Sequence, residues 1–339
     1  MENGAPSQRK NILERNKTLI RNILDAVLIF TIVSLILVIT FYEIQKREYE
    51  EIITKVGNKN ITPTSHVHVH EQVHLSLGVE PNSMTIAWLT LTNLEDDSLT
   101  PTVKYSDNEL NLNISIKGIT KSFFDMSKSI KRFVHKVELK NLKPNTRYFY
   151  QVGDTKTWSK IFNFKNLDIN SNAKVCFFGD MDATYNGTTQ ALKNQIDKNE
   201  CHILVHVGDI AYHLFDDKGT YGDRYMNTIE QFAAYAPYMV IIGNHELEGD
   251  TYEHYNNIFA MPYDMYHLID DDHFYSFSIG NVNFIALNSV IYKKYAGFNG
   301  DSINRQFRWL KGKLNEIKKI RDKKPWIIVY FHHPIYCCD

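Results

Sequence analysis

Apolar and polar residues alternate along several short segments between residues 67 and 166. In one of them Met84, Ile86 and Trp88 alternate with Thr85 and Ala87. The same period of two returns in the segments 112–117 and 147–152. Period two is typical of strands, so we expect residues 67–166 to form a β-sandwich of immunoglobulin-like size without chemistry of its own.

Beyond residue 172, apolar segments with the length of strands alternate with loops and helices. The strand-like segments read AKVCFF, HILVHV, YMVII and WIIVYF, and a hairpin is expected to turn at Gly280 and Asn281. Apolar residues recur at helical spacing in 188–199 and 302–320, and the second helix has on one face Phe307, Leu310, Leu314 and Ile317. We therefore expect an α/β domain over residues 172–339.

An uncharged apolar run, AVLIFTIVSLILVITFY at residues 26–42, precedes both domains. It has about the length at which a helix spans a bilayer, roughly 17 to 25 residues. Because basic residues lie before it, the positive-inside rule makes residues 1–25 a cytosolic tail. We interpret 26–42 as a transmembrane signal anchor and 43–66 as a stalk and linker. The alternative is a cleaved signal peptide, whose apolar core is shorter, about 7 to 15 residues.

The anchor implies that both domains are luminal or extracellular. The chain would then belong to the secretory or endolysosomal system or to the cell surface. Asn60, Asn113 and Asn186 begin N-x-S/T triplets, which fits a glycoprotein on this route. The sequence leaves the organelle and the oligomeric state open.

Charge and composition narrow the possible partners. The 339 residues carry 38 basic and 39 acidic side chains, so nucleic-acid binding is not expected. The four cysteines lack CxxC spacing, and we expect Cys176 and Cys201 to be apolar core residues. Histidines alternate along one extended segment, at His66, His68, His70 and His74. They could share one face and bind a metal, but the simpler interpretation is the start of a strand without a function.

Four of the expected strands end in residues of the kind that bind metals. The carboxyl ends of strands converge at one edge of an α/β sheet, so residues far apart in the sequence can meet there. The residues expected to meet are Asp180, Asp209, Tyr212, Asn244, His245 and His332. Such a set suits two cations about 3.5 to 4 Å apart, with Asp209 as the bridging carboxylate.

Tyr212 indicates the kind of metal. A phenol with a pKa of about 10 binds metal well only as phenolate, which favours a hard ion such as ferric iron. A ferric ion also acidifies bound water, so hydroxide would be available below neutral pH. We therefore expect hydrolysis on the acidic side.

The same residues form ordered motifs, GDMD at 179–182, GDIAY at 208–212, GNHE at 243–246 and VYFH at 329–332. These motifs resemble those of the purple acid phosphatases, in their long two-domain form, within the calcineurin-like metallophosphoesterase superfamily. In the front domain HEQVHLSLG and MTIAWLT resemble the fibronectin-like sandwich of that family. The resemblance implies a metallophosphoesterase fold for residues 172–339.

The resemblance also implies a binuclear centre. Ferric iron would bind Asp180, Asp209 and Tyr212. A second divalent ion, which could be Fe, Zn or Mn, would bind Asp209, Asn244 and His332.

The implied enzyme is a membrane-anchored acid phosphatase. Metal-bound hydroxide would attack the phosphorus of a phosphate monoester. Asn244 and His245 would contact the phosphate, and His245 would help to protonate the leaving alcohol.

Two features depart from the family pattern. Asp182 stands where the family has glycine, and we expect its carboxylate to slow turnover or weaken phosphate binding. No G-H-x-H block follows VYFH, so the chain is interpreted as C-terminally truncated and each metal as lacking one histidine. His333 is not expected to substitute, because neighbouring side chains on a strand point to opposite faces.

Two other functions are compatible with these residues. The chain could be a catalytically deficient, membrane-anchored binding module that lacks the last ligand block. It could also be a related diesterase or nucleotide hydrolase. The iron content would distinguish the binding module from the phosphatase. A comparison of monoester with diester substrates would distinguish the diesterase or nucleotide hydrolase from the phosphatase.

Overall fold

The computed structural model describes residues 69–91, 100–154, 156–168, 170, 172–182, 186–263, 273–292 and 300–334. They lie in a compact unit that runs from Val67 to Asp339. The expected tail, anchor and stalk at residues 1–66 lie outside the described ranges. Within these ranges, no helix combines the length and the apolar character needed to cross a membrane.

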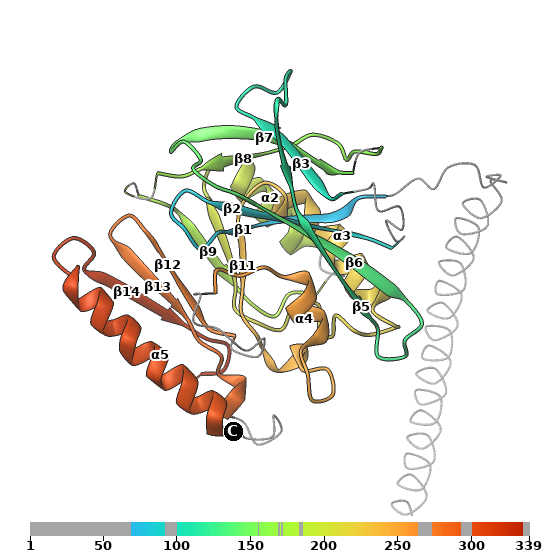
Figure 1. The fold of residues 1–339 in the computed structure, drawn as a ribbon. Helices are drawn as coiled ribbons and strands as arrows, with labels where there is room; N and C mark the ends of the chain where they lie inside the picture. Colours follow the sequence, from blue (N-terminus) through green and yellow to red (C-terminus); the bar gives the residue numbers. More distant parts are fainter. Residues whose placement is uncertain are drawn as a thin grey trace, which may run out of the picture. The chain divides into compact units, whose positions relative to one another are not determined.

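Two four-stranded antiparallel sheets form a sandwich in the first part of this unit (Figure 1). The first sheet has the order β1-β2-β6-β5 and consists of β1 (Glu71–Leu77), β2 (Met84–Thr90), β6 (Lys131–Leu139) and β5 (Ile119–Phe124). The second has the order β4-β3-β7-β8 and consists of β4 (Ile114–Lys117), β3 (Thr102–Ser106), β7 (Thr146–Gly153) and β8 (Phe162–Asn166). Both sheets contribute side chains to one core that includes Trp88, Tyr150 and Phe164. The prediction of a β-sandwich from period two is confirmed.

One predicted strand is shorter than expected. The alternation over 112–117 corresponds only to β4, which begins at Ile114, so Leu112 precedes the strand. β4 lies at the edge of its sheet, where it has a neighbour on one side only. This position explains why Ile114 is exposed despite its apolar side chain.

In the sheet β1-β2-β6-β5, the strands β1, β2 and β6 are buried on both faces, whereas the edge strand β5 is exposed except at Phe123. One face meets the second sandwich sheet, and the other packs against the α/β part of the chain through Leu89, Phe123 and Val134. Arg132 of β6 is fully buried and donates two hydrogen bonds, of 2.9 and 2.6 Å, to the Asp223 carboxylate. The first sheet is therefore part of the support of the α/β part.

The α/β part contains two three-stranded sheets. A parallel sheet has the order β11-β10-β9 and consists of β11 (Tyr238–Val240), β10 (Ile203–His206) and β9 (Val175–Phe178). A mixed sheet has the order β12-β13-β14 and consists of β12 (Tyr275–Ile279), β13 (Val282–Ala286) and β14 (Trp326–Tyr330). The hairpin between β12 and β13 turns at Gly280, which has a φ of 58°, and at Asn281, as predicted.

Helices accompany these sheets (Figure 1). They are α2 (Asn186–Asp197), α3 (Thr220–Ala233), α4 (Glu253–Ile258) and α5 (Gly300–Lys319), with short 3₁₀ helices η1 (Asn244–Glu246) and η2 (Val290–Tyr292). The alternation of strands and helices predicted an α/β architecture, and that prediction is confirmed.

The apolar face predicted for α5 is buried only in part. Ile317 is buried, but 62% of the Phe307 side chain is exposed. The helix instead attaches through its neighbour Gln306, which accepts a hydrogen bond from the Asn288 backbone N–H at 2.8 Å and donates one to the Asn288 carbonyl at 3.1 Å. The buried side of α5 thus contains Ser302, Gln306 and Ile317.

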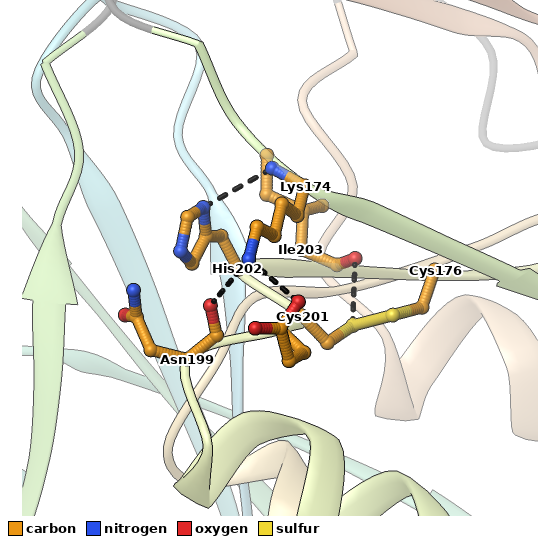
Figure 2. The surroundings of a disulfide bond; sticks show 7 residues. Lys174, Cys176, Asn199, Cys201, His202 and Ile203 are labelled. Atoms are coloured by element: carbon orange, nitrogen blue, oxygen red, sulfur yellow. Dashed lines mark hydrogen bonds and ion pairs between the residues drawn. A yellow bond between two sulfur atoms is a disulfide. The ribbon is translucent and has the colours of Figure 1, made fainter.

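Cys176 and Cys201 form a disulfide, which the sequence did not predict (Figure 2). Their expected place in the apolar core is confirmed, because Cys201 is buried in the core and Cys176 packs against it. Cys176 lies in β9 and Cys201 lies just before the neighbouring strand β10, which brings their Cα atoms to 5.7 Å. That separation is within the range that a disulfide needs. A spacing of 25 residues contains no hint of this pairing, because the adjacency arises from the parallel sheet.

The two described histidines of the alternating segment have protein partners. His70 Nε2 lies 2.9 Å from Thr157 Oγ1, and His74 lies against the carbonyl groups of Gln72 and Ile258, at 2.8 and 3.2 Å. Burial lowers the pKa of His74 to about 4. These contacts favour the start of a strand over a metal site. His66 and His68 lie outside the described residues.

The disulfide yields a first prediction. Replacing Cys176 and Cys201 together by serine should lower the free energy of unfolding by about 3 kcal/mol, because the cross-link closes a loop of this length in the unfolded chain. Urea denaturation at constant pH would measure the loss, with Cys337→Ser as the control that leaves the bond intact. Peptide mapping without reduction that finds Cys176 or Cys201 alkylated would contradict the assignment.

Candidate functional site

The carboxyl ends of β9, β10, β11 and β14 meet in one place. Asp180 follows β9, Asp209 follows β10, Asn244 follows β11, and His332 follows β14. β14 belongs to the mixed sheet, yet His332 Nδ1 lies 2.9 Å from the carbonyl oxygen of Val207 beside β10. This hydrogen bond ties the two sheets together at the edge that carries the polar residues.

Three possible metal ligands form the centre of this cluster. Asp180, Asp209 and His332 each offer one ligand atom, and these atoms lie within 4.8 Å of one another. Asn244 Oδ1 lies 3.2 Å from His332 Nε2, and the Tyr212 hydroxyl donates to Asp180 Oδ1 at 3.1 Å. The structure thus brings together the five residues expected to hold metal.

His245 lies beside the cluster. Its backbone N–H donates to Asp209 Oδ1 at 3.0 Å, and its Nε2 lies 3.8 Å from Asp209 Oδ2. Its ring also has an edge contact with the Tyr212 ring, with centroids 4.9 Å apart. The sequence predicted His245 next to the expected metal ligands, and the structure places it there.

The chemistry of these donors fits a cation. His332 Nδ1 faces a carbonyl oxygen and must carry its proton, so the neutral ring has its lone pair on Nε2. That lone pair faces Asn244 Oδ1 and, at 3.4 Å, Asp209 Oδ1. His332 Nε2, Asn244 Oδ1 and Asp209 Oδ1 face one another, and nitrogen and oxygen atoms of these kinds bind metal ions.

The electrostatics of the site agree with this conclusion. Burial alone would lower the pKa of His332, but the hydrogen bond and the charge of Asp209 raise it above its usual value. Burial would raise the pKa of Asp209, but His332 and the His245 backbone N–H lower it. Both shifts mean that the protein favours positive charge beside Asp209.

Glu246 holds the two central loops together. Its buried carboxylate accepts hydrogen bonds from the backbone N–H groups of Asp209, Ile210 and Gly243, at 2.9, 2.6 and 2.6 Å. Burial raises the pKa of Glu246 to about 8, while the three donors act in the opposite direction. The sequence shows Glu246 as the last residue of GNHE, but nothing in the sequence assigned it this clamp.

Two glycines allow these loops to approach closely. A Cβ on Gly243 would lie 2.2 Å from Asp209 Oδ1 and 2.4 Å from the Asp209 nitrogen. A Cβ on Gly208, whose φ is +90°, would lie 2.8 Å from His332 Nδ1. Neither position can accept a side chain without moving a residue of the cluster.

The backbone after β10 is left-handed at several residues without glycine. Asp209, Ala211, Tyr212 and His213 have φ values of 55°, 63°, 48° and 93°. Such conformations cost about 1 to 3 kcal/mol each and persist where the surrounding structure imposes them. Their concentration here shows that the GDIAYH segment, which contains two of the expected metal ligands, is held in a strained conformation.

Asp182 is tied to a helix. Its Oδ1 accepts a hydrogen bond from the Tyr221 hydroxyl at the start of α3. Burial and then the Asp182 carboxylate raise the pKa of Tyr221 to about 12, so this phenol stays a donor. The cluster of Asp180, Asp209 and His332 does not include Asp182.

Two histidines next to predicted ligands have different surroundings. His333 follows His332, but its backbone N–H donates to Ser289 Oγ at 2.8 Å and its Nδ1 lies 3.3 Å from the same oxygen. His213 follows Tyr212, and its Nε2 lies 2.8 Å from His245 Nδ1. The contact between His213 and His245 was not predicted, because it depends on the left-handed backbone.

Comparison with known proteins agrees with these features. Residues 70–166 match the family model described as the purple acid phosphatase N-terminal domain, and residues 173–339 match that of the calcineurin-like phosphoesterases. Acid phosphatase type 7 of Homo sapiens is 33% identical over 275 residues, which are 79% of this chain and 60% of the human protein. Purple acid phosphatase 15 of Arabidopsis thaliana is 27% identical over 312 residues, covering 78% of this chain and 56% of the plant protein.

A solved structure shows a similar fold. The purple acid phosphatase from yellow lupin seeds superposes with a TM-score of 0.61 at 20% identity, over 77% of this chain and 50% of the lupin chain. The present chain spans about 60% of the length of the human relative.

The close contact of the two loops yields a second prediction. Gly243→Ala should reduce the bound metal per chain and lower the melting temperature, because the new methyl group must displace Asp209. Gly312→Ala is the matched control, because a Cβ there meets nothing within 4 Å and alanine favours a helix by about 1 kcal/mol. Metal analysis and thermal denaturation of both variants would test it, and normal metal content in Gly243→Ala would contradict the close packing.

Proposed function

Because this chain belongs to the purple acid phosphatases of the calcineurin-like phosphoesterases, we propose that it is an acid phosphatase that hydrolyses phosphate monoesters. The observation that carries the proposal is the meeting of Asp209, Asn244 and His332 at the ends of three strands. A site that concentrates oxygen and nitrogen ligand atoms is suited to metals that in turn attract phosphate.

The residues present divide between two metal positions. Asp180, Asp209 and Tyr212 would hold ferric iron, and Asp209, Asn244 and His332 would hold a second divalent ion. When bound, the metals would supply positive charge for the phosphate oxygens and would acidify water for attack on phosphorus. The hydrogen bond from Tyr212 to Asp180 supports this division, because it places the phenol oxygen beside a carboxylate of the first group.

His245 would serve the substrate rather than the metals. Its backbone is held by Asp209, and its ring nitrogen Nε2 lies on the side of the Asp209 carboxylate. From there the ring could contact a phosphate oxygen and donate a proton to the leaving alcohol. A positioned general acid contributes on the order of 10² to 10⁴ in rate.

The substrate class is tested with the full-length chain after loading with iron and zinc. We expect hydrolysis of 4-nitrophenyl phosphate and little hydrolysis of bis(4-nitrophenyl) phosphate. A preference for the diester would favour a phosphodiesterase. Absence of both activities in a metal-loaded, folded protein would favour a non-catalytic binding module.

Tyr212 provides the third prediction. Tyr212→Phe should abolish the visible absorption band that a tyrosinate-to-iron bond produces and should reduce the iron content, because phenylalanine has no ligand oxygen. Tyr221→Phe is the matched control, since it removes a phenol that contacts Asp182 instead, and its band should remain. Equal spectra for wild type and Tyr212→Phe would contradict the assignment of Tyr212 to iron.

Asp182 provides the fourth prediction. If its carboxylate repels the phosphate, Asp182→Gly should lower KM by about fivefold, which corresponds to a repulsion on the order of 1 kcal/mol. Tyr221→Phe keeps the charge and removes its hydrogen bond, so KM should not fall in that variant. An unchanged KM in Asp182→Gly would show that the contact with α3 holds the carboxylate away from the substrate.

We also propose that residues 26–42 anchor the chain in a membrane of the secretory or endolysosomal system or the cell surface, with the phosphatase site luminal or extracellular. The apolar run and the preceding basic residues support this orientation. The Cys176–Cys201 disulfide supports it as well, because disulfides persist in oxidising compartments.

Glycosylation tests the orientation. Asn113 is exposed just before β4 and begins an N-x-S/T triplet, so it can carry a glycan only if this domain is luminal. Glycosidase treatment should shift the electrophoretic mobility of the wild type, and this shift should be smaller in Asn113→Gln. Protease digestion of the described domains in sealed microsomes would place them in the cytosol instead.

A further inference from the structure

A second histidine contacts the ring of His245. His213 Nε2 lies 2.8 Å from His245 Nδ1, and the two ring centroids are 4.7 Å apart. His213 Nδ1 in turn lies 3.2 Å from Asp216 Oδ2. The three side chains therefore form a chain of hydrogen bonds that ends at His245.

The partners define the direction of these bonds. A carboxylate only accepts, so His213 Nδ1–H donates to Asp216. The neutral His213 ring then has its lone pair on Nε2, which must accept from His245 Nδ1–H. The other nitrogen of His245, Nε2, lies on the side of Asp209, at 3.8 Å from Oδ2.

The backbone places His213 where it can make this contact. Ala211, Tyr212 and His213 are left-handed in succession, with φ values of 63°, 48° and 93°. The Tyr212 ring meets His245 by its edge, and the ring of the next residue, His213, meets it as well. Without the left-handed turn, neighbouring side chains of an extended segment would point to opposite sides.

His245 is thereby fixed at two points. Its main chain is held by Asp209, and its ring is held at Nδ1 by His213. Rotation of the ring about its bond to Cβ would break the second contact while the first remains. The orientation of Nε2 toward the ligand cluster therefore depends on His213.

We propose that His213, held by Asp216, is a positioning residue that fixes the ring orientation of His245 by accepting from its Nδ1–H, which leaves Nε2 as the nitrogen that gives a proton to the leaving alcohol when both nitrogens of the ring are protonated. The inference rests on the proposed function of His245 at the phosphate. It concerns a group that does not itself contact the substrate, because both ring nitrogens of His213 are engaged by Asp216 and His245.

Kinetics of the full-length, metal-loaded chain test the role. His213→Ala should lower kcat by about 10-fold or more with KM changed by less than about threefold, because misplacing a reacting group by 1 Å costs up to about 10²-fold. His213→Gln should recover most of kcat, since the glutamine amide oxygen can accept at the position of Nε2. Equal losses in both variants, or an unchanged kcat in His213→Ala, would overturn the inference.

Asp216 offers a matched pair of variants. Asp216→Ala should reproduce part of the loss, and Asp216→Asn should not, because the asparagine oxygen still accepts from His213. Asp217→Asn is the control for the change in charge, since this neighbouring carboxylate accepts from Thr220 instead. A loss in Asp217→Asn as large as in Asp216→Ala would show a general effect of the loop and would overturn the role of Asp216.

A spectroscopic measurement separates this inference from the proposed function. In the zinc-loaded chain labelled with ¹⁵N-histidine, the His245 signal, identified by its loss in His245→Gln, should show the proton on Nδ1. In His213→Ala a part of the population should carry it on Nε2. An inactive wild type with the expected tautomer change would contradict only the proposed function, whereas an active wild type with no change would contradict only the role of His213.

Discussion

One buried carboxylate determines the geometry of the ligand cluster. Glu246 receives backbone N–H groups from both the loop after β10 and the loop after β11. Because the donors are main-chain groups, the clamp fixes Cα positions rather than flexible side chains. This arrangement is required for three features of the site. They are the hydrogen bond from His245 N–H to Asp209, the close approach of Gly243 to Asp209, and the position of Asn244. Buried polar groups of this kind must be satisfied, so the two loops have few alternative arrangements.

Around this clamp the protein tolerates backbone conformations that are unfavourable by themselves. The left-handed residues after β10 turn three side chains toward one region, which a regular strand or helix would distribute over different sides. Their cost is offset by the hydrogen bonds of Glu246 and by a large apolar core beneath, to which Ile210, Ala211 and Leu214 contribute. The residues of the candidate site thus lie mainly in strained loops, whereas the packed strands beneath these loops form most of the apolar core.

The sequence predicted the parts of the molecule that repeat a simple rule. Alternating residues gave the sandwich, strands that end in Gly and a polar residue gave the cluster, and Gly280 with Asn281 gave the hairpin. It did not predict Cys176 with Cys201, the polar anchor Gln306, or His213 with His245, because each depends on which segments become neighbours. The contacts of Glu246 belong to the same group, since the motif contains the residue but two of its three partners, Asp209 and Ile210, lie in another loop. Local periodicity and strand ends predict which segments share a sheet edge, but they do not predict which individual side chains come into contact.

The sheet β1-β2-β6-β5 has a consequence for the order in which the chain is made. Its second face, with Leu89, Phe123 and Val134, is covered by segments that the ribosome produces later. Until those segments emerge, the newly made sandwich presents an apolar surface and the unpaired charge of Arg132. Chaperones would therefore bind an incomplete protein that exposes one apolar surface, and pauses in synthesis after residue 166 would prolong that exposure.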